Sequence, residues 1–501
     1  MIRNVLAIVV TAGLASGLHG CHAYDCREWS MCGMPPEEEP PTCDPAVSGI
    51  IGACAGVFVS SSLGSDDNPG TRDQPVSTMG KAMELAQTGA RRVYACAEVF
   101  AEPTTIATGV ELWGGLDCSA GWAYVGESKK TTIAPESGAI PLRFMAGTGR
   151  AIAADVHAEA ADATQPGGSS IVALVSAGAV VDILRSELVA GHGADGAPGM
   201  SGGQLPAEAG EAGAPGGAAC SASTVQGGPG AINSCRGFDS VGGLGGNGNV
   251  SQGSSGFSGT PEPVPNPGGD GLGGVGQSGA STCEPGKNGA WGAHGEHGKG
   301  ASGPGRITEQ GWEGVPGKDG GDGRPGQGGG GGGGSRAGAA FCGTSLGGAS
   351  GGAGGTGGCG GAGGKGGGYG GGSIGVLTLS EEISIRSTSI ITSRGGNGGL
   401  GGGAQERGTG GPGGLGGASV NNSPPGCRGG DGGAGGRGGA GGGGLGGPSI
   451  GILYSFGHAP TLEDNVIRTD EAGSGGLGGD PNVPGSAGED GLRAEYLGFP
   501  P

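Results

Sequence analysis

Acidic and histidine side chains are the first residues to test for chemistry, because paired carboxylates serve as general acid and base and clustered histidines bind metals. Asp66 and Asp67 form an adjacent pair directly before Asn68-Pro69-Gly70. That context favours a turn, since Asp, Asn, Pro and Gly are the usual turn residues. His294 and His297 lie three residues apart in a glycine-rich stretch, where a solvated loop is a simpler interpretation than a metal site. No metal ligand is predicted.

A second candidate for catalysis is Gly191-His192-Gly193, which is similar to the Gly-His-Gly element of polygalacturonases. The Asn-x-Asp and Arg-x-Lys elements that accompany it in that family are not visible in the proper order. In a chain so rich in glycine, the triplet is expected by chance. It also lies at the end of a repeated unit, where the other copies read Arg394-Gly395 and Ala472-Gly473. No catalytic residue is predicted.

Glycine motifs and tryptophans give weak signals for ligands. No Gly-x-Gly-x-x-Gly string follows a predicted strand and opens a helix, as phosphate binding requires. Gly320-Gly321-Asp322-Gly323 and Gly429-Gly430-Asp431-Gly432 are similar to units of calcium-binding repeats, but they do not occur in series. Calcium is therefore weakly supported and no cofactor is predicted. Trp291 and Trp312 could stack on sugars or anchor loops.

The cysteines indicate an oxidising compartment. The chain has 13 cysteines, none spaced as Cys-x-x-Cys, so the pattern is typical of disulfides rather than of zinc sites. If Cys21 is set aside, twelve remain, enough for six disulfides. These candidates are Cys26, Cys32, Cys43, Cys54, Cys96, Cys118, Cys220, Cys235, Cys283, Cys342, Cys359 and Cys427.

The first residues predict a lipoprotein signal peptide. Met1-Ile2-Arg3 is a short positive start, and Val5 to Leu18 is an apolar stretch too short to span a bilayer. Leu18-His19-Gly20-Cys21 resembles a bacterial lipobox, although a small residue is usual in place of His19. Cys21 would then be acylated more than once, because a single lipid chain anchors only marginally. His22, which is not Asp, favours the outer membrane. The alternative is ordinary secretion with one unpaired thiol.

Composition and charge exclude several classes of protein. Lys and Arg number 26 against 45 Asp and Glu, a net charge of −19, so binding to nucleic acid or to anionic lipid by charge is not expected. Glycine accounts for 134 of 501 residues, while hydrophobic residues are 34% and aromatic residues 4%. These proportions argue against one large conventional core and favour a repetitive architecture.

The region after residue 56 predicts short strands and one helix. Met79, Ala82, Met83 and Ala86 fall at helical spacing, with Ser77 or Thr78 as N-cap and Gly89 as the stop. The predicted strands are Val57–Ser60, Val93–Cys96, Val110–Trp113 and Trp122–Val125.

An internal repeat is the most informative feature. Ser170–Val175, Ser373–Thr378 and Ser449–Tyr454 align, and each is followed by further apolar positions at similar offsets, then by glycine. The third apolar positions are Leu188, Ile390 and Ile467. Three short strands per unit suit one coil of a β-solenoid, which buries its apolar face only when coils stack.

Glycine tracts separate the repeats. In the stretch that begins at Gly311, glycine recurs at every third position, which suits a polyproline-II helix. A collagen rod is not expected, because the register slips repeatedly. Flexible loops are the favoured interpretation, and packed extended glycine helices are the alternative. Six of the cysteines lie in these tracts, which implies that the tracts follow some fixed path.

The stretch from Val57 to Trp122 resembles the N-terminal part of right-handed parallel β-helix (pectin-lyase-like) lipoproteins of Gram-negative bacteria. The matching text includes Val57-Phe58-Val59-Ser60, Gly64–Thr71, Val93-Tyr94-Ala95-Cys96 and Trp113-Gly114-Gly115-Leu116-Asp117-Cys118. The resemblance implies that the short helix caps one end of the solenoid and that Cys96 bonds to Cys118. It implies a cell-surface location and no established activity.

The predicted fold is all-β: a right-handed parallel β-helix with a short N-terminal capping helix and long Gly-rich loops. The predicted organisation is a lipoprotein signal peptide (1–20), a Cys/Pro/acidic tether (21–45), the N-terminal β-helix part (46–190), a Gly-rich insertion (191–372), one coil (373–394), a Gly-rich loop (395–447), a further coil (448–470) and a Gly-rich tail (471–501).

Two functions are compatible with this organisation, and a third, ice or surface binding by glycine helices, would need a flat repeated face that the slipping registers do not favour. The first is a non-enzymatic, surface-exposed lipoprotein that the lipid on Cys21 anchors in the bacterial outer membrane, with a structural or adhesive role and a polysaccharide or envelope protein as partner. The alternative is a polysaccharide lyase or hydrolase acting on the β-helix face. Asp182, Ser384 and Thr461 share one repeat offset without matching, which counts against a carboxylate-lined groove.

Overall fold

The computed structural model describes residues 43–49, 54–455, 457 and 459–499, which fall into two units divided after Cys54. In the first unit, helix α1 (Pro45–Ser48) begins at Asp44, whose carboxylate accepts a hydrogen bond from the Ala46 N–H at 2.9 Å. A disulfide joins Cys43 to Cys54. Cys21, Cys26 and Cys32 lie outside the described residues.

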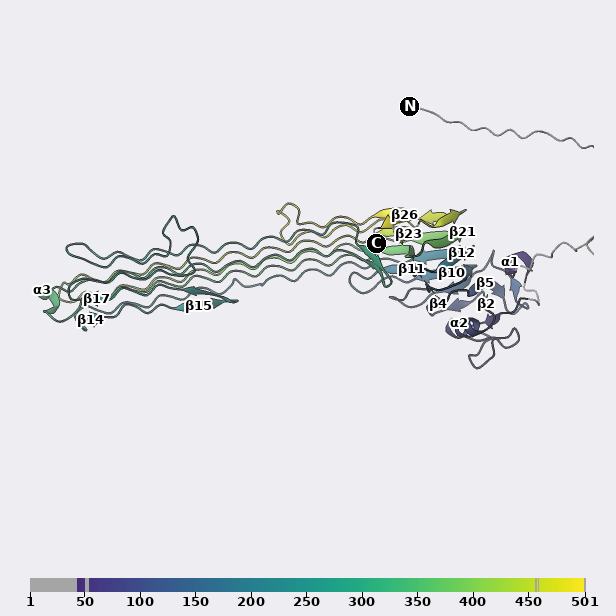
Figure 1. Ribbon diagram of the computed structural model, residues 1–501, viewed down its shortest axis with the longest axis horizontal. Helices are drawn as coiled ribbons and strands as arrows, with labels where there is room; N and C mark the ends of the chain where they lie inside the picture. Colours follow the sequence, from purple (N-terminus) through teal and green to yellow (C-terminus); the bar gives the residue numbers. More distant parts are fainter. Residues whose placement is uncertain (1–42, 50–53, 456, 458, 500–501) are drawn as a thin grey trace, which may run out of the picture. The chain divides into compact units, whose positions relative to one another are not determined.

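Three parallel sheets form the apolar part of the second unit (Figure 1). Sheet 1 contains, in order, β1 (Val57–Val59), β2 (Arg92–Cys96), β5 (Glu111–Asp117), β9 (Arg150–Ala154), β12 (Val180–Leu184), β21 (Glu382–Arg386) and β24 (Thr461–Glu463), with β6 (Ala123–Tyr124) antiparallel to β5. Sheet 2 contains β3 (Val99–Phe100), β7 (Thr131–Ile133), β10 (Val156–Ala160), β13 (Glu187–Ala190), β22 (Ser389–Thr392) and β25 (Val466–Arg468). Sheet 3 contains β4 (Thr104–Ile106), β8 (Leu142–Phe144), β11 (Ser170–Val175), β20 (Ser373–Thr378), β23 (Ser449–Ser455) and β26 (Arg493–Phe499).

The repeat sets the register of these sheets. Ser170 pairs with Ser373, and Ser373 pairs with Ser449, along three neighbouring strands of sheet 3. Leu188, Ile390 and Ile467 line up in the same way in sheet 2. Each repeat thus places one strand in each sheet, and the β-branched and Leu side chains between the sheets form a continuous apolar core. Its fully buried members include Val181, Ile183, Leu188, Val376, Ile385, Ile390 and Ile452.

A ladder of polar residues forms the corner between sheets 1 and 2. Asp155, Arg185, Ser387 and Asp464 follow the paired strands of sheet 1, and all four have a positive φ between 46° and 57°. The residues that follow the last three are polar: Ser186, Thr388 and Asn465. Each accepts a hydrogen bond from the backbone of the preceding repeat. The Val156 N–H donates to the Ser186 hydroxyl at 3.3 Å, the Ser186 N–H to the Thr388 hydroxyl at 3.3 Å, and the Thr388 N–H to the Asn465 side chain at 2.9 Å. These bonds satisfy backbone donors that the turn removes from the sheets.

Helix α2 (Met79–Thr88) confirms the predicted helix, with Thr78 as its N-cap and Gly89 as its C-cap. The Thr78 hydroxyl accepts a hydrogen bond from the Lys81 N–H at 3.1 Å. Met79, Ala82, Met83 and Ala86 are buried, and the helix packs against β1 and β4, which are the end strands of sheets 1 and 3. It therefore covers sheet edges that would otherwise be open to pairing.

The glycine tracts form an ordered bundle, which we call the glycine bundle (residues 193–372, 394–447 and 471–491). Extended segments run side by side in Figure 1 and are joined by backbone hydrogen bonds at every third residue. For example, the N–H groups of Gly193, Gly196 and Gly199 donate to the carbonyls of Arg394, Asn397 and Leu400. A three-residue period is that of the polyproline-II helix, so residues 347–372 span about 80 Å at about 3.1 Å per residue.

The interior of the bundle explains the run of glycine at 328–334. The N–H groups of these residues donate in turn to three segments (254–260, 352–355 and 284–287), and their carbonyls accept from three others (243–246, 274–277 and 427–430). A Cβ atom on any of the seven glycines would come closer than 3.0 Å to a carbonyl oxygen of a neighbour. No other residue fits a segment with neighbours on all sides.

Short elements complete the bundle. They are the antiparallel pairs β14 (Thr224–Val225) with β17 (Gly248–Asn249), β15 (Ile232–Cys235) with β16 (Phe238–Val241), and β18 (Arg306–Thr308) with β19 (Gly311–Glu313), and helix α3 (Ala339–Cys342). Disulfides pin the segments together: Cys220–Cys342, Cys235–Cys359 and Cys283–Cys427.

The predicted fold class is wrong. The sequence predicted a single right-handed parallel β-helix with long Gly-rich loops, whereas the strands form several separate parallel sheets and the glycine tracts form a hydrogen-bonded bundle. The number of strands in a repeat fixes neither the number of sheets nor the path of the chain between repeats. In the stretch 471–501, predicted as a tail, residues 473–491 contribute hydrogen-bonded segments to the bundle and residues 493–499 form strand β26 of sheet 3.

Candidate binding groove on the glycine bundle

A groove of about 600 Å³ opens on the side of the glycine bundle. One wall is the β15–β16 hairpin, one is the segment 293–296, and the floor is the segment 321–325 with Gly360. The hairpin is fixed there by the Cys235–Cys359 disulfide and by the Asn233 side chain, which donates to the Gly357 carbonyl at 3.0 Å. The groove therefore has walls that do not need to be ordered by a ligand.

The groove carries paired charges and one aromatic ring. The Arg324 guanidinium lies over the ring of Phe238, 4.3 Å from its centroid. Arg236 lies 3.9 Å from the carboxylate of Asp322, which also accepts a hydrogen bond from the Gly363 N–H at 2.8 Å. Phe238 is still 49% exposed. Glu296, which also lines the groove, is exposed and forms no ion pair among the described residues. The groove therefore offers an aromatic ring, exposed backbone and a carboxylate.

An exposed tryptophan, Trp291, lies two residues before Ala293 on the same segment and does not itself line the groove. Trp291 is 68% exposed, and the Arg407 guanidinium lies 4.5 Å from its ring. Trp312, for which the same two roles were predicted, is instead buried. Its indole N–H donates to the Pro304 carbonyl at 3.1 Å, and its ring packs edge-on against Tyr369. Of the two, Trp291 is the one available to a ligand.

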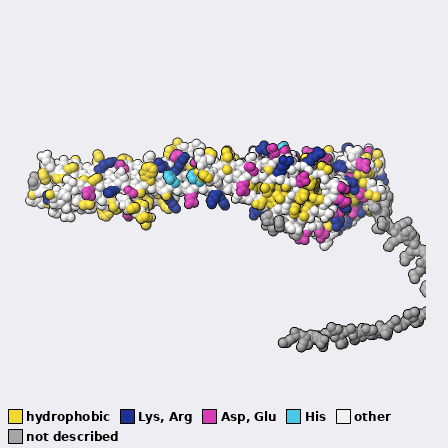
Figure 2. All heavy atoms as spheres, turned by 90° about the horizontal axis from the view of Figure 1, so that it is seen from above, with side chains coloured by type: hydrophobic (Ala, Val, Ile, Leu, Met, Phe, Trp, Pro, Cys, Tyr) yellow, Lys and Arg dark blue, Asp and Glu magenta, His cyan; other side chains and the backbone are white. Residues whose placement is uncertain are grey.

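The histidines of the bundle act as backbone acceptors. The Nδ1 atoms of His294 and His297 accept hydrogen bonds from the N–H groups of Arg437 and Ala440, at 2.9 and 3.1 Å. Each ring therefore carries its proton on Nε2. Within the described ranges no three His, Cys, Asp or Glu side chains gather as metal ligands would. In Figure 2, histidine side chains (cyan) lie beside Lys, Arg, Asp and Glu side chains on the surface shown.

Asp66 has the structural role that the turn context suggested. Its carboxylate accepts hydrogen bonds from the N–H and hydroxyl groups of Ser77 and Thr78, at 2.8 to 2.9 Å. Partial burial acts to raise the pKa of Asp66, but the hydrogen bonds from Thr78 and Ser77 outweigh it and hold the pKa below its usual value. His192 is exposed, and its N–H donates to Asp162 at 2.6 Å.

Asp182, at the repeat position that the sequence considered for a catalytic groove, also has a structural role. Asp182, Ser384 and Thr461 lie in register on neighbouring strands of sheet 1. The Asp182 carboxylate is buried and lies 2.6 Å from Arg150 and 3.5 Å from Arg386. Both guanidinium groups engage the carboxylate, so Asp182 joins strands β9, β12 and β21 through ion pairs.

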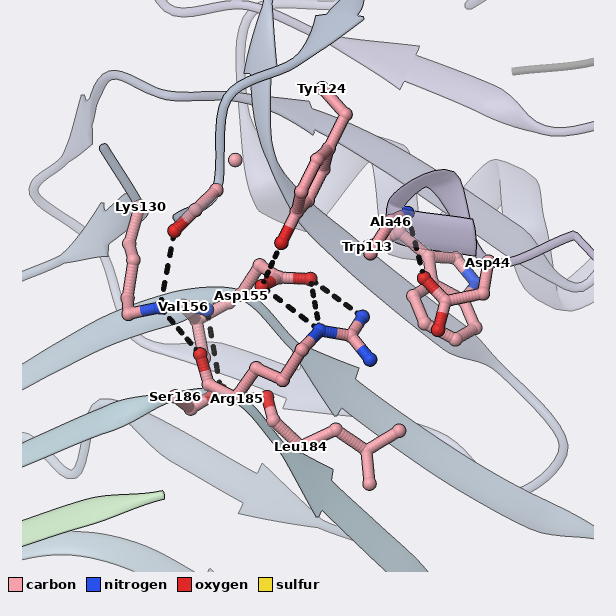
Figure 3. Close-up of polar contacts among 12 residues, drawn as sticks. Asp44, Ala46, Trp113, Tyr124, Lys130, Asp155, Val156, Leu184, Arg185 and Ser186 are labelled. Carbon is pink, nitrogen blue, oxygen red and sulfur yellow. Dashed lines mark hydrogen bonds and ion pairs between the residues drawn. The ribbon is translucent and has the colours of Figure 1, made fainter. Parts of the chain in front are cut away.

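A corner cluster joins Tyr124 and Arg185 to the buried carboxylate of Asp155 (Figure 3). Arg185 forms an ion pair with Asp155 at 2.8 Å, and the Tyr124 hydroxyl donates to the other oxygen at 2.8 Å. Burial, together with the hydrogen bond to Asp155, raises the pKa of Tyr124 to about 12. Lys130 donates to the Arg185 carbonyl at 2.6 Å. The cluster fixes the corner between sheets 1 and 2.

The structure joins Cys96 to Cys118, the pair that the resemblance implied. Sequence reasoning missed the groove and the stacking of Arg324 on Phe238. A signal was present in the change from Gly-x-y triplets at 317–326 to uninterrupted glycine at 328–334, because the groove lies beside that change.

No helix within the described residues is both long enough and apolar enough to cross a membrane. Comparisons of the chain with protein-family models, with curated proteins and with solved structures find no match.

Proposed function

We propose that the chain is a non-enzymatic surface lipoprotein of the bacterial outer membrane, anchored by lipid on Cys21, with an adhesive role carried by the glycine bundle. The observation that carries the adhesive role is the groove with its neighbouring exposed Trp291. The anchor rests on the Leu18-His19-Gly20-Cys21 motif and on the oxidising compartment that the five disulfides require.

The construction of the bundle suits adhesion. Its backbone is hydrogen-bonded at every third residue and cross-linked by three disulfides, so a ligand meets a surface that is already ordered. A pre-ordered surface avoids much of the entropy loss that weakens binding by flexible loops. Large apolar side chains also project from the bundle, including Met200, Leu205, Trp291 and Leu415. Each of these side chains adds apolar contact area that a ligand can bury.

Expression of the full chain in a Gram-negative host tests both parts of this proposal. Radiolabelled palmitate should enter the wild-type chain and not a Cys21→Ser variant, which should leave the outer-membrane fraction. Cells with the wild-type chain should be retained on surfaces coated with polysaccharide or envelope material, without release of new reducing or unsaturated ends. Palmitate labelling of the variant would contradict the anchor, and polysaccharide cleavage would favour the lyase or hydrolase alternative.

A further inference from the structure

The groove lies where the extended segment 253–260 would run if it continued along the central segment of the bundle. Along residues 253–260 the bundle is complete, because the N–H groups of Gly328, Gly331 and Gly334 donate to the carbonyls of Thr260, Phe257 and Ser254. Counting back by three residues from Gly328, this row of donors continues with Pro325, which has no N–H, and then with Asp322. Asp322 lines the groove. The floor of the groove therefore presents the same side of the central segment that residues 253–260 cover further along.

Donors on the groove walls lack the partners that equivalent residues have. On the neighbouring segment, the N–H groups of Glu284 and Lys287 donate to the carbonyls of Val275 and Leu272, and the Ala290 N–H donates to the Gln327 side chain. The next two residues of this row, Ala293 and Glu296, both line the groove. Among the described residues, neither these two N–H groups nor that of Asp322 has a hydrogen-bond acceptor. The groove thus offers backbone donors at the three-residue spacing of the bundle.

The charges of the groove favour a neutral, backbone-mediated ligand over an acidic polysaccharide. Arg324 is stacked on Phe238, Arg236 faces Asp322, and the exposed carboxylate of Glu296 would repel an anion. A uronate carboxylate would have to compete with these internal contacts. An extended chain would instead meet the open N–H groups with its carbonyls. Residues 253–260 do this along the row of Asp322, and residues 271–277 do it along the row of Ala293 and Glu296.

We propose that the groove binds an extended peptide with glycine at every third position, supplied by a partner chain. This rests on the proposed adhesive function and names its ligand class. Glycine is required where the peptide faces the floor, because a Cβ atom on Gly253, Gly256 or Gly259 would approach the carbonyls of Gly334, Gly331 or Gly328 to less than 3.0 Å. Proline suits the outward position, since the N–H groups of Ser255 and Ser258 make no backbone hydrogen bond in the described structure. It also favours the polyproline-II conformation.

The test uses the full chain and a fluorescent synthetic peptide of Gly-Ser-Pro triplets, with an Ala-Ser-Pro peptide as its control. Fluorescence anisotropy should show saturable binding of the glycine peptide and about tenfold or weaker binding of the alanine peptide, because the added methyl groups overpack the floor. Ala293→Phe should fill the groove and weaken binding by about tenfold or more. The matched variant Ala197→Phe, at an exposed position on another segment, should bind normally.

Three outcomes would overturn the proposal: no binding of the glycine peptide, equal binding of both peptides, or unchanged binding by the Ala293→Phe variant. An acidic polysaccharide that binds the wild-type chain and not Ala293→Phe, when the peptide fails, would assign the groove to sugars instead. Cell retention measured in parallel separates the two proposals, because retention without peptide binding leaves the adhesive function standing and removes only this ligand.

Discussion

The sheets and the glycine bundle are held together by different parts of the same chain. In the sheets, side chains such as Ile183, Leu188 and Ile390 are fully buried, and the strands bond through their backbones to neighbouring strands of the same sheet. In the bundle, the backbone itself fills the interior and bonds in several directions, while most non-glycine side chains lie outside. Figure 2 shows the contrast, with apolar side chains dense over one part and separate over the other.

The difference teaches that the glycine content of a bundle segment reflects how many other segments pack around it. Residues 328–334 have neighbours on all sides and are all glycine. The segment 426–447 mostly repeats two glycines and one other residue, and its other residues include the exposed Arg428 and Arg437. The segment 284–301 has open sides and mostly repeats one glycine with two other residues. The spacing of glycine in a low-complexity segment therefore specifies whether the segment lies inside the bundle or at its surface.

The largest effect is expected from Gly331→Ala at the centre of the bundle. The new Cβ atom would approach the Leu244 carbonyl to less than 3.0 Å, and neither backbone can move without breaking several hydrogen bonds. We expect a loss of about 4 kcal/mol or more in the free energy of unfolding of the bundle, read from hydrogen exchange of its amides. Gly403→Ala is the control, since its nearest neighbour is the Ser201 hydroxyl at 3.7 Å. Similar losses in both variants would refute the neighbour rule.

A smaller loss is expected from Ile385→Ala in sheet 1. Ile385 is fully buried between the sheets, so the cavity should cost about 2–5 kcal/mol in denaturant unfolding. The control is Leu462→Ala, because Leu462 pairs with Ile385 in register but lies on the end strand and is 36% exposed. Its expected cost is below about 1 kcal/mol. If the two variants lose the same stability, side-chain burial is not what holds the sheets.

The smallest effect concerns the corner cluster and its pH dependence. The pKa of Tyr124 rises from 10.0 to about 12 on folding, so this group contributes stability that is complete below pH 10 and is lost as the pH rises to about 12. Tyr124→Phe should lower the free energy of unfolding by about 1 kcal/mol at neutral pH. Its unfolding midpoint should also fall less between pH 10 and pH 12 than that of the wild type. Parallel profiles would show that the hydroxyl is not coupled to folding.

Local patterns could be predicted from the sequence and long-range arrangement could not. The caps of α2 and the register of Ser170, Ser373 and Ser449 follow from spacing and repetition. The sheet number and the bundle depend on which distant segments pair, and glycine carries no side chain that could reveal its partner. The groove was missed for the same reason, because it exists only where the segments 253–260 and 271–277 both stop.

The order of the bundle segments along the chain has a consequence for the time course of folding. The central glycines 328–334 need partners as far apart as residues 243 and 430, and two of the disulfides join cysteines 124 and 144 residues apart. Contacts of such long range form slowly. We therefore expect the bundle to be completed last, after the sheets. Bundle segments that have not yet paired during folding should aggregate little, because long runs of glycine lack the β-propensity on which amyloid-like pairing depends.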